Sequence, residues 1–201
     1  MAQITEKTID LDGCLIHALE CGPQDGQTVV LLHGMKFQAE TWRELGTLAV
    51  LADLGLHVVA VDMPGFGKST ASTLSTQEVL ARLYQQQKYS QAVLIGPSMG
   101  GRIALEFAIA HPEKISGLVL IGAVGVTENQ SGLSRIAAPV LVIWGEEDQV
   151  SPLTNSDILL QGLSHARREI YPHAPHPCYL GQPDRWHESL KAFFTDLKSE
   201  S

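Results

Sequence analysis

A serine flanked by glycines stands where an apolar run meets a segment of helical period. The pattern is G-x-S-x-G, with Ser98 at its centre and Gly96 and Gly100 on either side. In a strand-to-helix turn of this kind the serine is strained and exposed, and the glycines give clearance where side chains would collide with the crossing backbone. The N–H of Met99, at the helix start, then points toward a developing oxyanion. We therefore predict that Ser98 is a nucleophile and Met99 an oxyanion donor, the alternative being a tight turn whose serine only caps the helix.

A nucleophilic serine requires a base and a group that orients the base, and in this setting they are expected later in the chain, in the order Ser, acid, His. The stretch APVLVIWGEEDQVSP places three carboxylates just past a buried strand, where the active-site loops of open α/β sheets gather. Glu146 and Glu147 directly follow Gly145 and are predicted to form the turn. Asp148 lies further into the loop and is the candidate acid, the alternative being a turn or cap carboxylate.

Three of the eight histidines remain candidates after those in strands, in helices or at their ends are set aside; the five set aside are His17, His57, His111, His165 and His187. His33, upstream of Ser98 at a strand end, suits the shaping of an oxyanion loop. His173 and His176 both lie in the stretch REIYPHAPHPCYLGQP, which begins with the last predicted strand, and the residues alone leave both open as the base. An H-x-x-H pair could also bind a metal ion, but no third ligand stands at a suitable spacing, so no metal and no other cofactor is predicted.

The elements that must position these residues alternate between strand and helix. Near-continuous apolar runs predict strands within 28–34, 57–65, 92–96, 115–124 and 138–145. Segments of helical period lie at 39–54, 75–87, 99–111, 152–163 and 184–198. This alternation predicts an α/β fold with a doubly wound, mostly parallel sheet. The amino-terminal stretch turns at Asp12-Gly13 and predicts an antiparallel hairpin on the sheet edge, and a single domain over residues 1–201 accounts for the sequence.

The overall charge limits the classes of partner. The net charge is −8 and the sequence has no run of Lys or Arg, which argues against nucleic acid or an anionic membrane surface as the partner. The polar start MAQITEKTID and the absence of a long apolar window predict a cytoplasmic protein without membrane insertion. Three cysteines at no metal-like spacing are expected to be reduced thiols.

Five segments, taken in order, resemble the α/β-hydrolase superfamily across essentially the whole chain: LLHGMKFQAETW, VDMPGFGKS, GPSMGG, WGEEDQVSP and HPCYLGQPDRWHESLKAFF. The first of them, extended to LLHGMKFQAETWRELGTLAVLADLG, and the unusual HPCYLGQPDRWH look most like the α/β-hydrolase domain-containing protein 14 family, which consists of small enzymes without a lid domain. One departure is that the serine turn of that family can carry serine where this sequence has Gly96 and Gly100.

The resemblance implies roles that the spacing leaves open. In that family the histidine immediately before P-C-Y-L is catalytic, which maps to His176 and makes His173 a neighbour. The residue after His-Gly in the superfamily supplies a second oxyanion N–H, which maps to Met35. Ser98 and Asp148 stand at the positions of the nucleophile and the acid.

The connection between residues 124 and 138 has only about a dozen residues, too few for a lid of several helices. The site is therefore expected to be open, which suits a short acyl group or one presented on a larger carrier, and does not suit carbon–carbon bond hydrolysis in a sealed cavity. Met35, Met99 and Tyr179 are expected to line a shallow slot, with Tyr179 as a substrate-binding residue. The alternative is a long groove between Met35 and the 124–138 connection.

These residues together predict a serine hydrolase or acyltransferase that acts on a small-molecule ester, thioester or activated amide. Ser98 attacks the acyl carbon, His176 transfers the proton, and Asp148 holds the imidazole, while the N–H groups of Met35 and Met99 stabilise the oxyanion. Halide-releasing relatives use an aspartate nucleophile and are excluded by the serine. Two alternatives remain, an interaction protein on a catalytically idle hydrolase scaffold and a metal-dependent hydrolase that uses the H-x-x-H pair.

Overall fold

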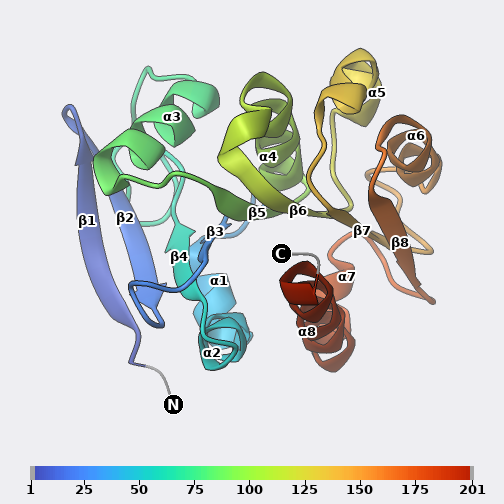
Figure 1. Ribbon diagram of the computed structural model, residues 1–201, viewed down its shortest axis with the longest axis horizontal. Helices are drawn as coiled ribbons and strands as arrows, with labels where there is room; N and C mark the ends of the chain where they lie inside the picture. Colours follow the sequence, from blue (N-terminus) through green and yellow to red (C-terminus); the bar gives the residue numbers. More distant parts are fainter. Residues whose placement is uncertain (1–2, 200–201) are drawn as a thin grey trace.

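The computed structural model of the chain describes residues 3–199 and is built on one eight-stranded sheet (Figure 1). The strands are β1 (Thr5–Leu11), β2 (Cys14–Cys21), β3 (Thr28–Leu31), β4 (His57–Val61), β5 (Ala92–Pro97), β6 (Ile115–Ile121), β7 (Val140–Gly145) and β8 (Ala166–Tyr171). The α-helices are α1 (Ala39–Glu44), α2 (Thr47–Asp53), α3 (Thr76–Gln87), α4 (Met99–Ala110), α5 (Val126–Asn129), α6 (Thr154–Gly162), α7 (Cys178–Gly181) and α8 (Pro183–Ser199), and 3-10 turns cover Pro112–Lys114 and Gln130–Arg135.

The strand order across the sheet is β1-β2-β4-β3-β5-β6-β7-β8. Strand β2 pairs antiparallel with β1 and with β4, and the other neighbouring strands pair in parallel. The turn between β1 and β2 contains Asp12 and Gly13, both with positive φ, as a two-residue hairpin turn requires. The predicted edge hairpin and mostly parallel sheet are confirmed.

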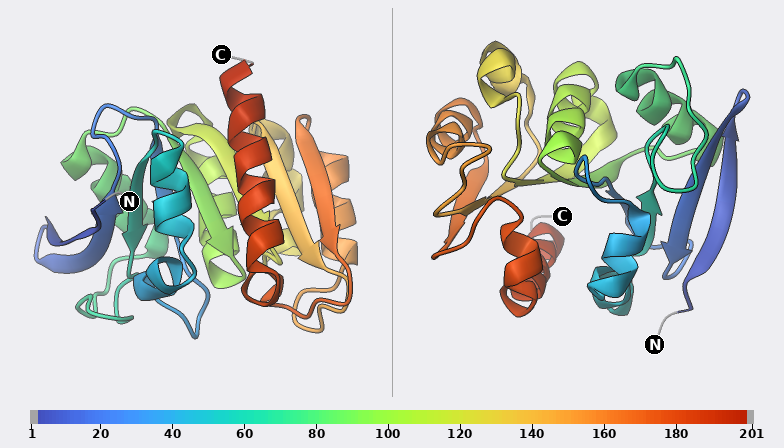
Figure 2. Two further views of the ribbon diagram at one scale, coloured as in Figure 1. Left: turned by 90° about the horizontal axis from the view of Figure 1, so that it is seen from below. Right: turned by 180° about the vertical axis from the view of Figure 1, so that it is seen from behind.

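Helices cover both faces of the sheet (Figures 1 and 2). Helices α3 to α6 lie on one face, and α1, α2, α7 and α8 lie on the other. Because both faces are covered, every residue of β4 and of β7 is buried, which explains why their sequences are apolar without alternation. The chain goes from β3 to β4 on one side of β3 and later returns to β5 on its other side, so the strand order reverses at β3, the place where open α/β sheets gather their sites at the carboxyl ends of the strands.

One sequence expectation about a helix is corrected, and two strands end earlier than their apolar runs. The region 39–54 forms two helices, α1 and α2, because Gly46 takes a φ of 83° that a continuous helix cannot include. The strands β3 and β4 are shorter than the apolar runs 28–34 and 57–65. The residues after each strand, such as Leu32 and Met63, leave the sheet while staying buried, so their apolar character reports burial and not strand pairing.

The connection between β6 and β7 is short, as expected. Within the described residues it holds only α5 and one 3-10 turn, so no lid domain is inserted at this position. Helix α8 is the longest helix, and none of the helices within residues 3–199 has the length and apolar character needed to cross a membrane.

Candidate active site

Ser98 lies at the junction of β5 and α4. Its φ of 50° and ψ of −112° form a strained conformation of the kind that costs about 1–3 kcal/mol. Contacts around the turn keep Ser98 in this conformation. The Ser98 N–H donates to the Ile121 carbonyl at 2.9 Å. The backbone is also tightly packed here, because a Cβ on Gly96 would lie only 2.2 Å from the Gly100 carbonyl oxygen. The Ser98 side chain makes no capping hydrogen bond to α4. A role as a simple helix cap is therefore wrong, and the hydroxyl is free for another use.

Asp148 and His176 meet although they follow different strands, β7 and β8. The Nδ1 of His176 lies 2.7 Å from Oδ2 of Asp148, whose side chain is completely buried. The other oxygen, Oδ1, accepts the backbone N–H groups of Val150 and Ser151 at 2.8 Å each. Since a carboxylate only accepts, His176 donates from Nδ1 and presents Nε2 as an acceptor. That Nε2 is buried and has no hydrogen-bond partner among residues 3–199, the Ser98 hydroxyl included.

Sequence reasoning missed two residues beside this pair. Gly122 follows β6 with a φ of 51°, and a Cβ there would lie 2.9 Å from Asp148 Oδ2 and 3.2 Å from His176 Nδ1. Ser151 is buried, and its hydroxyl donates to the Ala123 carbonyl at 2.7 Å, which ties the acid loop to the end of β6. A glycine directly after a buried parallel strand is the signal that could have pointed to Gly122.

His33 orients the peptide bond that joins Gly34 to Met35. The Gly34 carbonyl lies 2.8 Å from His33 Nδ1 and accepts the Phe37 N–H at 3.0 Å. The Met63 N–H donates to His33 Nε2 at 3.0 Å, so the neutral ring carries its proton on Nδ1 and donates it to Gly34. Burial lowers the pKa of His33, which favours this neutral form. In a trans peptide the N–H points away from the carbonyl, so the Met35 N–H is directed away from these partners.

The two expected oxyanion donors have free N–H groups. Within residues 3–199, neither the Met35 N–H nor the Met99 N–H donates a hydrogen bond. A Cβ on Gly34 would lie 3.9 Å from the Ser98 Cβ, so the loop after β3 and the turn after β5 are direct neighbours. Two unpaired donors beside a partly exposed serine can stabilise a negatively charged oxygen.

A cavity of about 20 Å³ lies against Ser98 and His176. Its walls are mostly apolar and include Phe37, Ile121 and Tyr179. The structure thus brings Tyr179 to the nucleophile. It corrects the expected slot, because the Met35 and Met99 side chains do not line this cavity and Met35 is 68% exposed.

The other candidate side chains either lie apart from Ser98 or are unreactive at neutral pH. Glu146 and Glu147 form the turn, as predicted, and the ring of His173 lies 3.6 Å from each of them with 86% of its side chain exposed. Burial raises the pKa of the Cys178 thiol to about 12, so this free cysteine stays protonated at neutral pH and does not compete as a nucleophile. No cluster of His, Cys, Asp or Glu in the described part of the chain could hold a metal ion.

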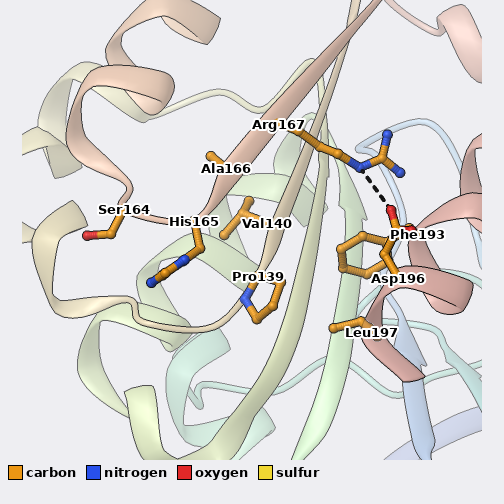
Figure 3. Close-up of a pocket in the computed structure, with 9 residues that line it drawn as sticks. All are labelled: Pro139, Val140, Ser164, His165, Ala166, Arg167, Phe193, Asp196 and Leu197. Atoms are coloured by element: carbon orange, nitrogen blue, oxygen red, sulfur yellow. Dashed lines mark ion pairs between the residues drawn. The ribbon is translucent and has the colours of Figure 1, made fainter. Parts of the chain in front are cut away.

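A larger pocket, of about 240 Å³, lies at the amino-terminal ends of β7 and β8 (Figure 3). It is lined by Val140 and Ala166, at the starts of β7 and β8, and by residues of α8. An ion pair between Arg167 and Asp196 at 3.9 Å borders it. Ser98 and His176 follow the carboxyl ends of their strands, so this pocket is separate from the candidate active site.

Comparisons with known proteins identify the family of this chain. The sequence model of the family described as "alpha/beta hydrolase fold" matches residues 27–132. ABHD14B of Rattus norvegicus, which bears the provisional name of protein-lysine deacylase, is 33% identical over 97% of this chain and 98% of its own length. ABHD14A of Mus musculus is 35% identical over 84% of this chain and 70% of its own length.

A solved structure supports the same fold. The crystal structure of a predicted CIB-like hydrolase from Thermoplasma acidophilum superposes with a TM-score of 0.93, at 22% identity, over 98% of this chain and 100% of that one. Its low identity restricts the likeness to the fold, whereas the identities to the ABHD14 proteins extend over most of the sequence. The chain therefore belongs to the α/β-hydrolase fold family and is similar within it to ABHD14B and ABHD14A.

Proposed function

We propose that this hydrolase cleaves or transfers short acyl groups through a covalent acyl-Ser98 intermediate. The observation that carries the proposal is the pairing of a strained, uncapped serine with a cavity into which the Asp148-held imidazole of His176 also faces. Ser98 Oγ attacks the acyl carbon while His176 Nε2 takes the hydroxyl proton. The carbonyl oxygen becomes an oxyanion that the N–H groups of Met35 and Met99 stabilise.

The intermediate then breaks down in the usual order for a serine hydrolase. His176 returns its proton to the leaving oxygen, sulfur or nitrogen, and the carbonyl of the acyl-enzyme re-forms. Water or another acceptor gives its proton to His176 and attacks the acyl carbon. His176 then returns that proton to Ser98 Oγ as the bond between Oγ and the acyl carbon breaks, which releases the acyl product and regenerates Ser98. Throughout, Asp148 keeps the Nδ1–H of His176 in place, and its own second oxygen is occupied by two backbone N–H groups.

The substrate class is an ester, a thioester or an amide of a short acyl group. The small cavity at Ser98 favours short acyl groups. The name of ABHD14B adds acylated lysine side chains in proteins to the amides worth testing. The first panel should therefore contain p-nitrophenyl esters, acyl thioesters and acyl-lysine peptides with the same acyl groups.

A fluorophosphonate probe tests the proposal directly. We expect it to label Ser98 covalently, and we expect Ser98→Ala to abolish labelling and to lower kcat by on the order of 10⁴ or more with the fold intact. Mass spectrometry of the labelled peptide and circular dichroism of the variant are the measurements. Labelling of another serine, or no labelling of folded protein, would favour an interaction protein on an idle hydrolase scaffold.

A further inference from the structure

The cavity at Ser98 has very little room. Its volume is about 20 Å³, and a cavity needs roughly 10–15 Å³ to hold a single water molecule. In the resting structure the enclosed space therefore accepts one small group, and an acyl chain of several carbons must displace part of a wall if it is to be buried there.

The walls differ in how firmly they are held. Ile121 ends a central strand and Tyr179 stacks on Trp42 with ring centroids 5.3 Å apart, and both are at least 98% buried. Moving either of them would open the hydrophobic core. Phe37, in contrast, lies in the loop between β3 and α1, outside any helix or strand, and is partly exposed. Of these three large apolar side chains, it is the one that can change without loss of the core.

Phe37 also stands beside the reacting atoms. Its Cδ2 is 3.2 Å from the position that a Cβ on Gly34 would take, and that position is 3.9 Å from the Ser98 Cβ. The Phe37 N–H donates to the Gly34 carbonyl, so the same turn that directs the Met35 N–H also places the ring. Its backbone N–H thus stabilises the turn, and its side chain lines the cavity.

We propose that the Phe37 side chain sets the upper limit on acyl length, an inference that rests on the hydrolase function proposed above and deepens it. An acetyl group fits with the ring in place, whereas a longer chain must push the ring outward. If the missing lid alone limited acyl length, a long chain would lie in solvent and removal of the ring would not improve its reaction.

The test measures kcat/KM for p-nitrophenyl acetate, butyrate, hexanoate and octanoate with the wild type, Phe37→Ala, Phe37→Trp and Phe66→Ala. Phe66 is the matched control, because it is also a partly exposed phenylalanine in a loop at the same sheet edge but does not line the cavity. Each methylene that becomes buried can raise the rate constant about fourfold. We expect Phe37→Ala to raise the octanoate-to-acetate ratio at least tenfold, and Phe37→Trp to lower the butyrate-to-acetate ratio.

The controls separate this inference from the function on which it rests. The ratio for Phe66→Ala should stay within twofold of the wild type, and thermal unfolding should show that every variant is folded. Suppose that the wild type is labelled at Ser98 and hydrolyses p-nitrophenyl acetate, but the octanoate-to-acetate ratio of folded Phe37→Ala is unchanged or matches that of Phe66→Ala. This result overturns the role of Phe37 and leaves the proposed hydrolase function standing. A folded wild type that is neither labelled nor active overturns both proposals.

Discussion

At the scale of single residues, hydrogen bonds fix the orientation of Asp148, His176 and His33 in and beside the candidate site. The carboxylate of Asp148 is buried and accepts three N–H groups, one of them from His176. His33 is held as firmly, with one nitrogen donating to Gly34 and the other accepting from Met63. Both imidazoles therefore have an assigned tautomer, and of the two only His176 has a ring nitrogen without a hydrogen-bond partner among the described residues.

Replacement of the two neighbouring histidines separates their roles. We expect His176→Ala to lower kcat by about as much as Ser98→Ala, because members of a triad act as a unit, and His173→Ala to cost tenfold or less. His173 is exposed and lies beside Glu146 and Glu147, away from the cavity. Steady-state kinetics with one ester checks this, and the reverse ranking would assign the base to His173.

A methyl group on Gly122 should disturb the acid–base pair directly. We expect Gly122→Ala to lower both kcat and the free energy of unfolding, the latter by about 1–3 kcal/mol for the positive φ. Gly125→Ala is the matched control. It has a φ of 72°, and its new Cβ would meet the flexible side chain of Arg102. Urea unfolding and kcat of both variants are the measurements, and equal losses of kcat would show that strain, and not contact with Asp148 and His176, is responsible.

At the scale of elements, one buried polar contact joins α8 to α2 across the face of the sheet. The indole N–H of Trp186, in α8, donates to Oγ1 of Thr47 at 2.9 Å, and His187 Nε2 lies 3.1 Å from the same oxygen. Trp186 and Thr47 are both fully buried, and the Trp186 ring also packs on Trp42 and Tyr179. The contact therefore supports the wall of the cavity to which Tyr179 belongs.

Removal of this hydroxyl should reduce stability without direct effect on the chemistry. Thr47→Val leaves the buried Trp186 N–H without a partner, and we expect the free energy of unfolding to fall by about 1–3 kcal/mol. In a Trp186→Phe background, which lacks that N–H, the same change should cost clearly less. Urea unfolding of the four proteins of this cycle gives the coupling energy, and a coupling near zero would contradict the importance of the bond.

At the scale of the whole molecule, two histidines link folding stability to pH. Burial lowers the pKa of His33, and burial also lowers the pKa of His187, in both cases from an ordinary value of 6.5. The unfolded chain binds protons at these positions more readily than the folded protein does. Their contribution to stability is therefore complete above pH 6.5 and is lost as the pH falls below 6.5 toward the lowered values.

We accordingly expect the free energy of unfolding to decrease from pH 7.5 to pH 5. His33→Gln should flatten this dependence, because one of the two histidines responsible is removed, although the variant is also less stable at pH 7.5 after losing bonds to Gly34 and Met63. Urea unfolding at half-unit pH steps provides the comparison. An equal or steeper decrease in His33→Gln would show that other groups cause the dependence.

Much of the architecture can be read from local patterns. The apolar runs, the alternation with helical periods and the Asp12-Gly13 turn predict the sheet, its mostly parallel pairing and the edge hairpin, because each depends on neighbours in sequence. The exact ends of helices and strands are harder to predict from the sequence. The break at Gly46 and the early ends of β3 and β4 arise because burial selects apolar residues in loops as well as in strands. That residues 1–201 form a single domain stays a prediction.

The candidate site, too, is partly predictable from local sequence and partly dependent on the tertiary structure. The sequence by itself determined that Ser98 lies in a strand-to-helix turn with glycines around it, since that signal is contained in five consecutive residues. The sequence pattern leaves both His173 and His176 open as the base, and the family resemblance implies His176. Only the tertiary structure decided that Asp148 and His176, 28 residues apart, meet at 2.7 Å, that Gly122 gives them room, and that Phe37 lines the cavity beside Ser98. The physical reason is that these contacts join the ends of different strands, and their distances depend on the packing of the whole sheet.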